Sequence, residues 1–165
     1  MQLELIGEAN GYVLTSDASG NATWKGPVSI SVRNMAGNPI IPNATFTPIT
    51  QWLTILNEDG GANYNNVTGE YTVTVTGNYH INASIFWIGF AGGGSSSLSA
   101  YVNGVFDYNT WTPTNTSQFA NVVSYEKRLN AGDVIRFYAF QSSGSPQSLF
   151  GVVNTNSFSI NLIHR

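Results

Sequence analysis

The stretch T-G-E-Y-T-V-T-V-T-G-N-Y-H-I-N-A-S-I, residues 68–85, decides the fold class. Tyrosine and valine alternate with threonine from residue 71 to residue 76, and after Gly77 an apolar and polar alternation resumes up to residue 85. A period of two in β-branched and aromatic residues is typical of a β-strand, because successive side chains point to opposite faces of a sheet. The stretch therefore predicts two strands joined at one glycine.

The composition of the whole chain favours a single all-β domain. Its 165 residues can bury a real core, and no window shows a helical period. Charged residues make up 9% of the chain, against about 25% in typical soluble domains, whereas Asn, Ser and Thr supply 51 residues. A net charge of −3 without a basic stripe argues against nucleic acid as a partner, and the lack of cysteine excludes disulfides and thiolate metal sites.

Further strands are predicted where apolar and polar residues alternate, and loops where Pro, Gly, Asn and Ser cluster. The predicted strands are 28–33, 52–56, 71–76, 77–90, 98–102, 105–111, 120–129, 134–140 and 157–164. The predicted loops are 34–48, 57–66, 91–97, 112–117 and 141–148. Asn103-Gly104 is a type I′ turn signal, and the N-A-G-D sequence at 130–133 predicts a tight turn capped by Asp133. Eight to ten strands at this spacing predict a sandwich, a jelly roll or a barrel.

Residues 1–27 differ in character from the rest, and we interpret them as a neck or stalk-end segment ahead of a head at 28–165. The segment buries too little apolar surface to fold alone, so we expect it to be ordered only where it packs on a partner chain or on the head. The sequence G-Y-V-L-T-S-D-A-S-G-N-A-T-W at 11–24 resembles segments that precede terminal domains in bacterial surface and phage tail-fibre-like proteins. The first nine residues lack the regions of a signal peptide, and no apolar run reaches transmembrane length.

Several short motifs occur in a fixed order along the head. They are N-x-x-G-x-x-Y-x-x-x-T-G-x-Y, approximately, at 57–71, G-x-Y-x-I at 77–81, Y-V-N-G at 101–104, L-x-A-G-D-x-I at 129–135 and N-S-F-S-I-N-L at 156–162. The ordered set resembles the globular head of the complement C1q family, within the tumour-necrosis-factor-like superfamily, over residues 28–165. The sequence departs from the family pattern at Ile81, at 74–75, where the usual proline is missing, and at Ile160-Asn161. These departures point to a divergent member of bacterial or phage type.

The resemblance implies a β-sandwich of about ten strands with the jelly-roll topology, assembled as a homotrimer at the end of a stalk, without enzymatic activity. The strand after Gly77 agrees with a trimer. One of its faces is apolar and the other is polar, but both become apolar toward its end. The outer apolar face there needs a cover, and a neighbouring subunit is the simplest one. The predicted trimer interface consists of Phe86, Trp87, Ile88 and Phe90. The alternative is that loops of the same chain cover these side chains.

The sequence F-D-Y-N-T-W at 106–111 mixes aromatic rings with amide and carboxylate groups, as sugar-binding sites do. The candidate ligand-binding residues are Asp107, Tyr108 and Trp111. The alternative is that the aromatic residues of this segment are ordinary members of the core or of the interface.

Catalytic and metal-binding motifs are weak in this sequence. The two histidines, His80 and His164, lie outside any recognisable catalytic motif, and a solvated or interface histidine is the simpler interpretation of each. Some members of the resembling family hold calcium at the top of the trimer, and Glu58, Asp59 and Asp107 could contribute oxygen ligands. No D-x-D-x-D spacing is present, so no metal or other cofactor is assigned.

Three functions are therefore compared. The first is the tip of a bacterial surface or phage-like fibre or adhesin, extracellular or on a virion, that binds a cell-surface glycan or protein. The second is a purely structural trimerisation cap for a stalk. The third and most remote is a carbohydrate-active enzyme. Under the first two, the partner is the chain itself as a homotrimer, with no nucleic acid and no membrane insertion.

Overall fold

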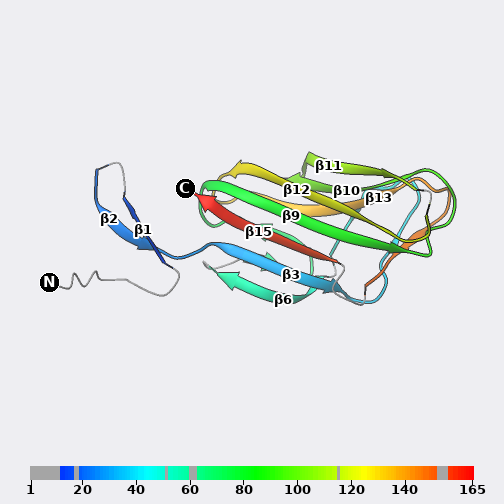
Figure 1. Ribbon diagram of the computed structural model, residues 1–165, viewed down its shortest axis with the longest axis horizontal. Helices are drawn as coiled ribbons and strands as arrows, with labels where there is room; N and C mark the ends of the chain where they lie inside the picture. Colours follow the sequence, from blue (N-terminus) through cyan, green and yellow to red (C-terminus); the bar gives the residue numbers. More distant parts are fainter. Residues whose placement is uncertain (1–11, 17–18, 51, 60–62, 115, 152–155) are drawn as a thin grey trace.

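The computed structural model describes residues 12–16, 19–50, 52–59, 63–114, 116–151 and 156–165. Every helix or strand assigned in these ranges is a β-strand, so the described part of the chain holds no helix able to cross a membrane. Two antiparallel sheets pack face to face as a sandwich, and a separate two-stranded hairpin stands at one end (Figure 1). The predicted all-β sandwich is confirmed.

One sheet has six strands in the order β11-β10-β13-β8-β7, with β5 pairing with β13. Its strands are β5 (Thr47–Pro48), β7 (Asn63–Asn65), β8 (Glu70–Thr72), β10 (Ser95–Val102), β11 (Val105–Pro113) and β13 (Val134–Gln141). The other sheet has seven strands in the order β4-β14-β9-β15-β3-β6, with β12 pairing with β9. Its strands are β3 (Ser29–Met35), β4 (Ile40–Ile41), β6 (Trp52–Asp59), β9 (Gly77–Ile88), β12 (Phe119–Leu129), β14 (Gln147–Leu149) and β15 (Ser157–His164).

The core lies between the two sheets. Along β9 every second residue from Gly77 onward is buried, as the period of two predicts. Tyr79 is fully buried, and its hydroxyl donates a hydrogen bond to the carbonyl of Val75 at 2.6 Å. β9 pairs with β12 along one edge and with β15 along the other, so it runs through the middle of the seven-stranded sheet.

The structure corrects several predicted boundaries. β8 and β9 belong to different sheets, so the chain crosses the sandwich between residues 72 and 77 instead of continuing one strand to residue 76. β4, β5 and β7 lie in predicted loops and β14 begins in one, because pieces of two or three residues are too short for a periodicity to show. β6 extends to Asp59 and β10 begins at Ser95, both inside predicted loops. The Gly60-Gly61 pair of the first motif lies outside the described residues.

The hairpin consists of β1 (Val13–Ser16) and β2 (Ala22–Lys25). It leads into β3 and lies beyond the end of the sandwich at which the chain also terminates (Figure 1). The guanidinium of Arg165 donates a hydrogen bond from Nη2 to the carbonyl of Gly26 at 3.4 Å. The division of the chain into a neck and a head at residues 27 and 28 stays a prediction.

Candidate functional site

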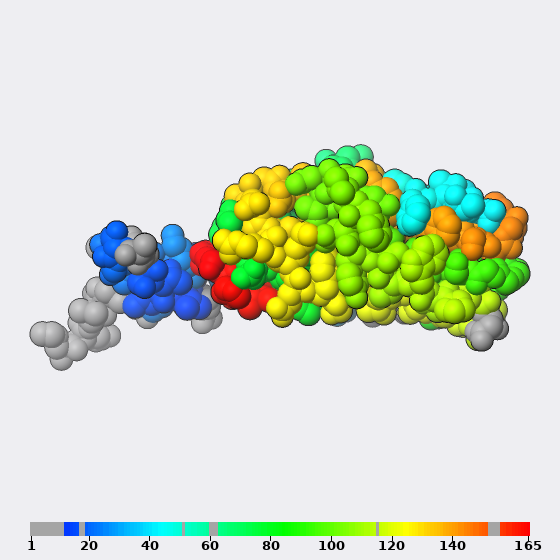
Figure 2. Space-filling model, turned by 90° about the horizontal axis from the view of Figure 1, so that it is seen from above, coloured from blue at the N-terminus to red at the C-terminus, as the bar shows by residue number. Residues whose placement is uncertain are grey.

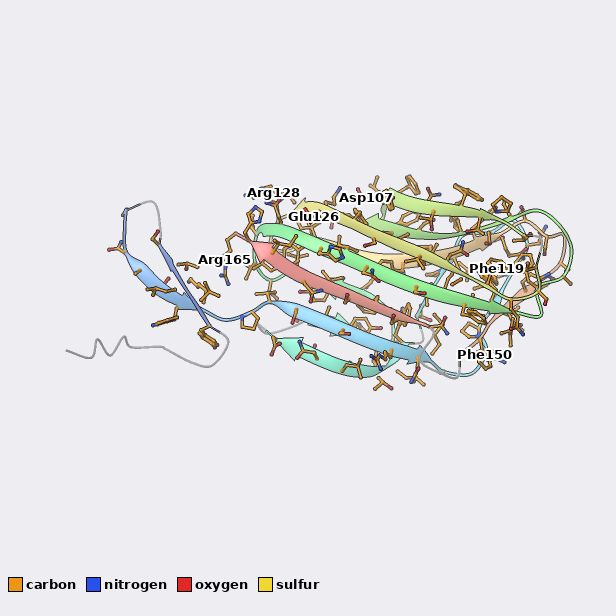
Figure 3. The ribbon with its side chains drawn as sticks, viewed as in Figure 1. Asp107, Phe119, Glu126, Arg128, Phe150 and Arg165 are labelled. Atoms are coloured by element: carbon orange, nitrogen blue, oxygen red, sulfur yellow. The ribbon has the colours of Figure 1, made fainter. Side chains whose placement is uncertain are left out.

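β11 and β12 lie side by side at one edge of the sandwich (Figure 2), and Asp107 lies at that edge (Figure 3). Two of the three predicted ligand residues, Asp107 and Tyr108, contact Tyr125 of β12 there. The carboxylate of Asp107 accepts a hydrogen bond from the hydroxyl of Tyr125 at 2.9 Å and forms an ion pair with Lys127. The ring of Tyr108 stacks on the ring of Tyr125, with centroids 4.7 Å apart and an interplanar angle of 20°. The Asp107 side chain is only 17% exposed, so its contacts with β12 use most of its surface.

The electrostatics of this edge fit a structural contact. Burial raises the pKa of Tyr125 above its usual value, and the hydrogen bond to Asp107 and the negative charge of Asp107 raise it further. The phenol therefore stays neutral and donates to the carboxylate. The hydroxyl of Thr110 on β11 also donates to the carbonyl of Val122 on β12 at 2.8 Å. These contacts close the edge between the two sheets.

Trp111 lies on the opposite face of β11 from Tyr108. In the register of β10 and β11, Tyr108 is opposite Ala100 and Trp111 is opposite Ser97, which puts the two side chains on opposite faces. The Trp111 ring packs edge-to-face on Phe140 at 5.3 Å. The three predicted ligand residues therefore do not converge on one site.

Trp111 belongs instead to a continuous group of rings on the outer face of the six-stranded sheet, called here the aromatic face. It consists of Phe46, Tyr101, Phe106, Trp111, Tyr138 and Phe140. The shortest centroid distances join Tyr101 to Tyr138 at 4.3 Å and Phe46 to Phe140 at 4.6 Å. Three of the rings are well exposed, at 39% for Phe46, 50% for Phe106 and 51% for Trp111.

Two hydroxyl groups lie beneath the aromatic face. Ser97 and Ser99 on β10 are fully buried, and neither hydroxyl has a hydrogen-bond partner among the described residues. They share this face because Ser97 is opposite Phe140 and Ser99 is opposite Tyr138. The sequence did not reveal this group of rings, since they come from three strands and the loop before β5. The one local signal was F-Y-A-F at 137–140, whose aromatic residues predict two apolar faces.

The predicted interface residues divide between the core and the surface. Trp87 and Phe90 are buried inside this chain, and the indole Nε1 of Trp87 donates to the Asn121 side-chain oxygen at 2.6 Å. Phe86 and Ile88 are half-buried on the outer face of the seven-stranded sheet. The Phe86 ring lies 6.5 Å from the ring of Phe150, which is at the end of the sandwich away from the hairpin (Figure 3). Of the four predicted interface residues, Phe86 and Ile88 are thus the two that a second chain could contact.

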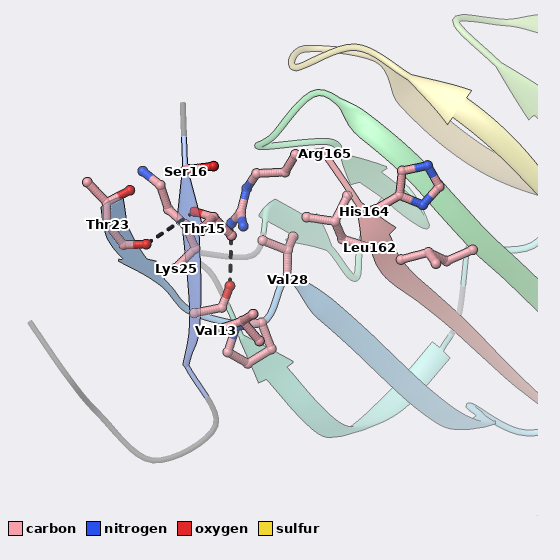
Figure 4. A pocket seen from close by; sticks show the side chains of 12 residues that line it. Val13, Thr15, Ser16, Thr23, Lys25, Val28, Leu162, His164 and Arg165 are labelled. Carbon is pink, nitrogen blue, oxygen red and sulfur yellow. Dashed lines mark hydrogen bonds between the residues drawn. The ribbon is translucent and has the colours of Figure 1, made fainter. Parts of the chain in front are cut away.

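A cavity of about 810 Å³ separates the hairpin from the end of β15 (Figure 4). Its lining includes the apolar or hydroxylic side chains of Val13, Thr15, Thr23, Val28 and Leu162, together with Lys25, His164 and Arg165. A smaller cavity of about 180 Å³ lies beside β4 and β5. Among the described residues that line these cavities there is no pair of carboxylates of the kind that glycoside hydrolysis uses as acid and base.

The histidines and carboxylates that the structure describes do not gather at one place. His80 Nε2 lies 3.4 Å from the hydroxyl of Ser124 on the outer face of the seven-stranded sheet, away from both cavities. In the described residues no three His, Asp or Glu side chains group together as metal ligands would. Asp59 accepts a hydrogen bond from the Asn57 amide at 2.7 Å, whereas Asp107 lies on the other sheet. Within the described part of one chain, these carboxylates therefore do not gather into a calcium site.

The sequence and the fold were compared with those of known proteins. No family model and no curated protein sequence matches the chain. Among solved structures, that of the Eiger TNF from S. frugiperda is similar, with a TM-score of 0.64 at 10% sequence identity. The similarity covers 84% of this chain and 93% of that chain. The chain therefore has a tumour-necrosis-factor-like jelly-roll fold.

Proposed function

We propose that the protein is the homotrimeric head of an extracellular fibre, on a cell surface or a virion, and that it binds a surface ligand. One observation carries the proposal. The outer face of the seven-stranded sheet has an apolar region that no described part of the same chain covers. This region, called here the assembly face, consists of Phe86, Ile88, Ala120, Val122 and Phe150.

The assembly face combines apolar residues from adjacent strands. Ala120 is opposite Phe86 in the register of β9 and β12, and Val122 is two residues further along the same face. Val122 is 46% exposed. An apolar region on a regular sheet is stabilised when a second surface covers it. A second copy of this chain is the simplest cover, since the resembling family is trimeric.

Part of the rest of that outer face offers amides and hydroxyls to an identical chain. Asn78, His80 and Asn82 on β9 lie on the same face as Ser159 and Asn161 on β15. Amide and hydroxyl groups can exchange hydrogen bonds across an interface without the cost of burying a charge. On β12 the same face carries Glu126 beside His80 and Arg128 beside Asn78, so an interface that reaches this end has to accommodate two opposite charges. The hairpin at one end then offers the point of attachment for a stalk.

Light scattering with size-exclusion chromatography tests the assembly. The protein at micromolar concentration should have three times the 17.8 kDa mass of one chain. Val122→Glu should give a monomer, because the new carboxylate is solvated in one chain and buried without a partner in the trimer. Val105→Glu is the matched control, since Val105 is 68% exposed at the start of β11 in the other sheet, and it should stay trimeric. A monomeric wild type, or a trimeric Val122→Glu protein, would contradict the proposal.

A purely structural cap is the second candidate. The contacts of Asp107 and Tyr108 with Tyr125 of β12 favour it, because they use two of the candidate ligand residues to join β11 to β12. A trimer that binds no glycan or protein of a cell surface would support the structural cap as the function.

A further inference from the structure

We propose that the aromatic face binds a neutral oligosaccharide, whose pyranose rings stack on Trp111, Phe46 and Phe106. This inference rests on the proposed function and names the ligand class of the head. It places the site on one face of the six-stranded sheet, in place of the convergent site that the sequence predicts at Asp107, Tyr108 and Trp111.

The chemistry of the exposed side chains carries the first step. Phe46, Phe106 and Trp111 expose between 39% and 51% of their surface and are held by ring contacts to the half-buried Tyr101 and Phe140. Tyr101 in turn packs on the ring of Tyr138. These supporting contacts fix the positions of the exposed rings before a ligand arrives. One face of a pyranose presents C–H groups, and such groups pack well on the electron-rich face of an aromatic ring. A rigid aromatic surface therefore binds a sugar at a small entropic cost.

A polar group lies beside the rings. Asn109 is two residues from Trp111 on β11 and opposite Ser99, so its side chain is on the same face. In the part of the chain that the structure describes, the half-buried amide of Asn109 has no side-chain hydrogen-bond partner. An amide offers both donors and an acceptor, which match the hydroxyl groups at the rim of a sugar ring. Stacking and hydrogen bonding are thus available within one short segment.

The charges select a neutral ligand. Among the described residues, the charged side chain found against these rings is that of Arg136, whose guanidinium lies 5.6 Å from the Tyr138 centroid. Arg136 also pairs with Glu70 at 3.5 Å, so its charge is already compensated. The face therefore offers no free cation to a sialylated or sulfated glycan, and electrostatic complementarity favours an uncharged one.

The position of the face agrees with the trimer. The assembly face lies on the outer side of the seven-stranded sheet, and the aromatic face lies on the outer side of the six-stranded sheet. The two faces therefore point in opposite directions across the sandwich. Trimerisation through one leaves the other open to solvent.

A glycan array tests the site on the full-length chain. The printed array should contain neutral hexose and N-acetylhexosamine oligosaccharides beside sialylated and sulfated ones. The wild type should bind neutral glycans, and Trp111→Ala should weaken that binding by at least about tenfold, as expected for the loss of a central stacked ring. Tyr108→Ala is the matched control, because Tyr108 is a 40% exposed ring on the opposite face of the same strand, and it should bind as the wild type does.

Tryptophan fluorescence gives a second readout. Trp52 and Trp87 are buried and Trp24 lies in the hairpin outside the sandwich, so an emission change caused by a glycan on the aromatic face should come from the half-exposed Trp111. Trp111→Phe should keep most of the affinity, since a ring remains, while losing the emission change. A variant that merely unfolds would lose both, and circular dichroism would show it.

Four results would overturn the proposal. They are a failure of the wild type to bind any neutral glycan on the array, a preference for charged glycans, unchanged binding by Trp111→Ala, or equal loss with Tyr108→Ala. Light scattering on the same samples separates this inference from the proposed assembly. A trimer without glycan binding rejects the aromatic site alone, whereas a monomer that binds glycan rejects the trimer alone. A mass above three chains that Trp111→Ala abolishes would mean that a second copy covers the face.

Discussion

At the scale of single residues, Gly77 shows why the central motif needs a glycine. A Cβ atom at this position would lie 2.5 Å from Leu162 Cδ1 and 2.6 Å from the carbonyl oxygen of His164. Gly77 thus allows the start of β9 to lie directly against the end of β15. The sequence identified the glycine as a junction between strands, but it could not identify the neighbour, because the contact joins segments far apart along the chain.

We expect Gly77→Ala to destabilise the fold by about 1–3 kcal/mol, because the added methyl group forces β9 and β15 apart. Urea unfolding followed by circular dichroism measures the change. Gly93→Ala is the control, since a Cβ there meets nothing within 4 Å and the backbone has no positive φ. Equal midpoints for the two variants would show that the close contact does not matter.

The side chains around residue 87 show the limit of a period of two. The alternation correctly predicted that every second side chain between residues 79 and 85 enters the core. It could not separate Phe86 from Trp87 near the end of the strand, where both faces are apolar. Burial of Trp87 depends on Asn121 of β12, which accepts the indole N–H at 2.6 Å. That partner is not visible in any local pattern.

At the scale of elements, two turns at the same end of the six-stranded sheet are linked to each other. Asp133 accepts the backbone N–H of Asn130 at 2.7 Å, which confirms the predicted cap of the N-A-G-D turn. Asn103 and Gly104 both have positive φ, as a type I′ turn requires. The sequence predicted both turns separately. It did not predict that the Asn103 amide donates to Asp133 at 2.8 Å and joins them.

The pKa of Asp133 is lowered, chiefly by the N–H of Asn130 and then by the Asn103 amide. Because its folded pKa is below the unfolded value, its contribution to stability is present above about pH 4 and is lost as pH falls through the folded pKa. Asp133→Ala should therefore lower the free energy of unfolding at pH 7 by no more than about 1 kcal/mol, since the group is exposed. The difference from the wild type should shrink as pH falls through the folded pKa of Asp133 and vanish once the carboxyl group is protonated. A difference that persists in acid would disprove the assignment.

At the scale of the whole molecule, buried tyrosines link the core to alkaline stability. Burial raises the pKa of Tyr71 to about 12 and also raises the pKa values of Tyr64 and Tyr125. The unfolded chain ionises its tyrosines near pH 10, so it loses protons that the folded chain keeps. The free energy of unfolding therefore falls as pH rises from about 10 toward 12.

Absorbance at 295 nm against pH checks this expectation. Exposed tyrosines should ionise first, and the buried ones should ionise together with the loss of the circular dichroism signal. Complete ionisation near pH 10 with an unchanged β-sheet spectrum would contradict it.

The strand pattern and the ordered motifs were enough to predict the sandwich, because burial on one face imposes a local period of two. The aromatic face could not be predicted in the same way. Phe46 comes from a proline-rich loop, and its neighbours Tyr101 and Phe140 come from β10 and β13. Their meeting depends on strand order, which a local period does not contain.

The entry of β3 from the hairpin has a mechanical consequence for a head attached to a stalk. β3 runs along the sandwich from the hairpin end (Figure 1) and pairs with β15 on one side and β6 on the other. Under the proposed attachment at the hairpin, a pull from the stalk would act parallel to β3 and load both rows of hydrogen bonds in shear. Bonds loaded in shear break together, whereas bonds at a peeled edge break one after another. The head should resist traction along its stalk far better than a force that peels the exposed strand β6 sideways.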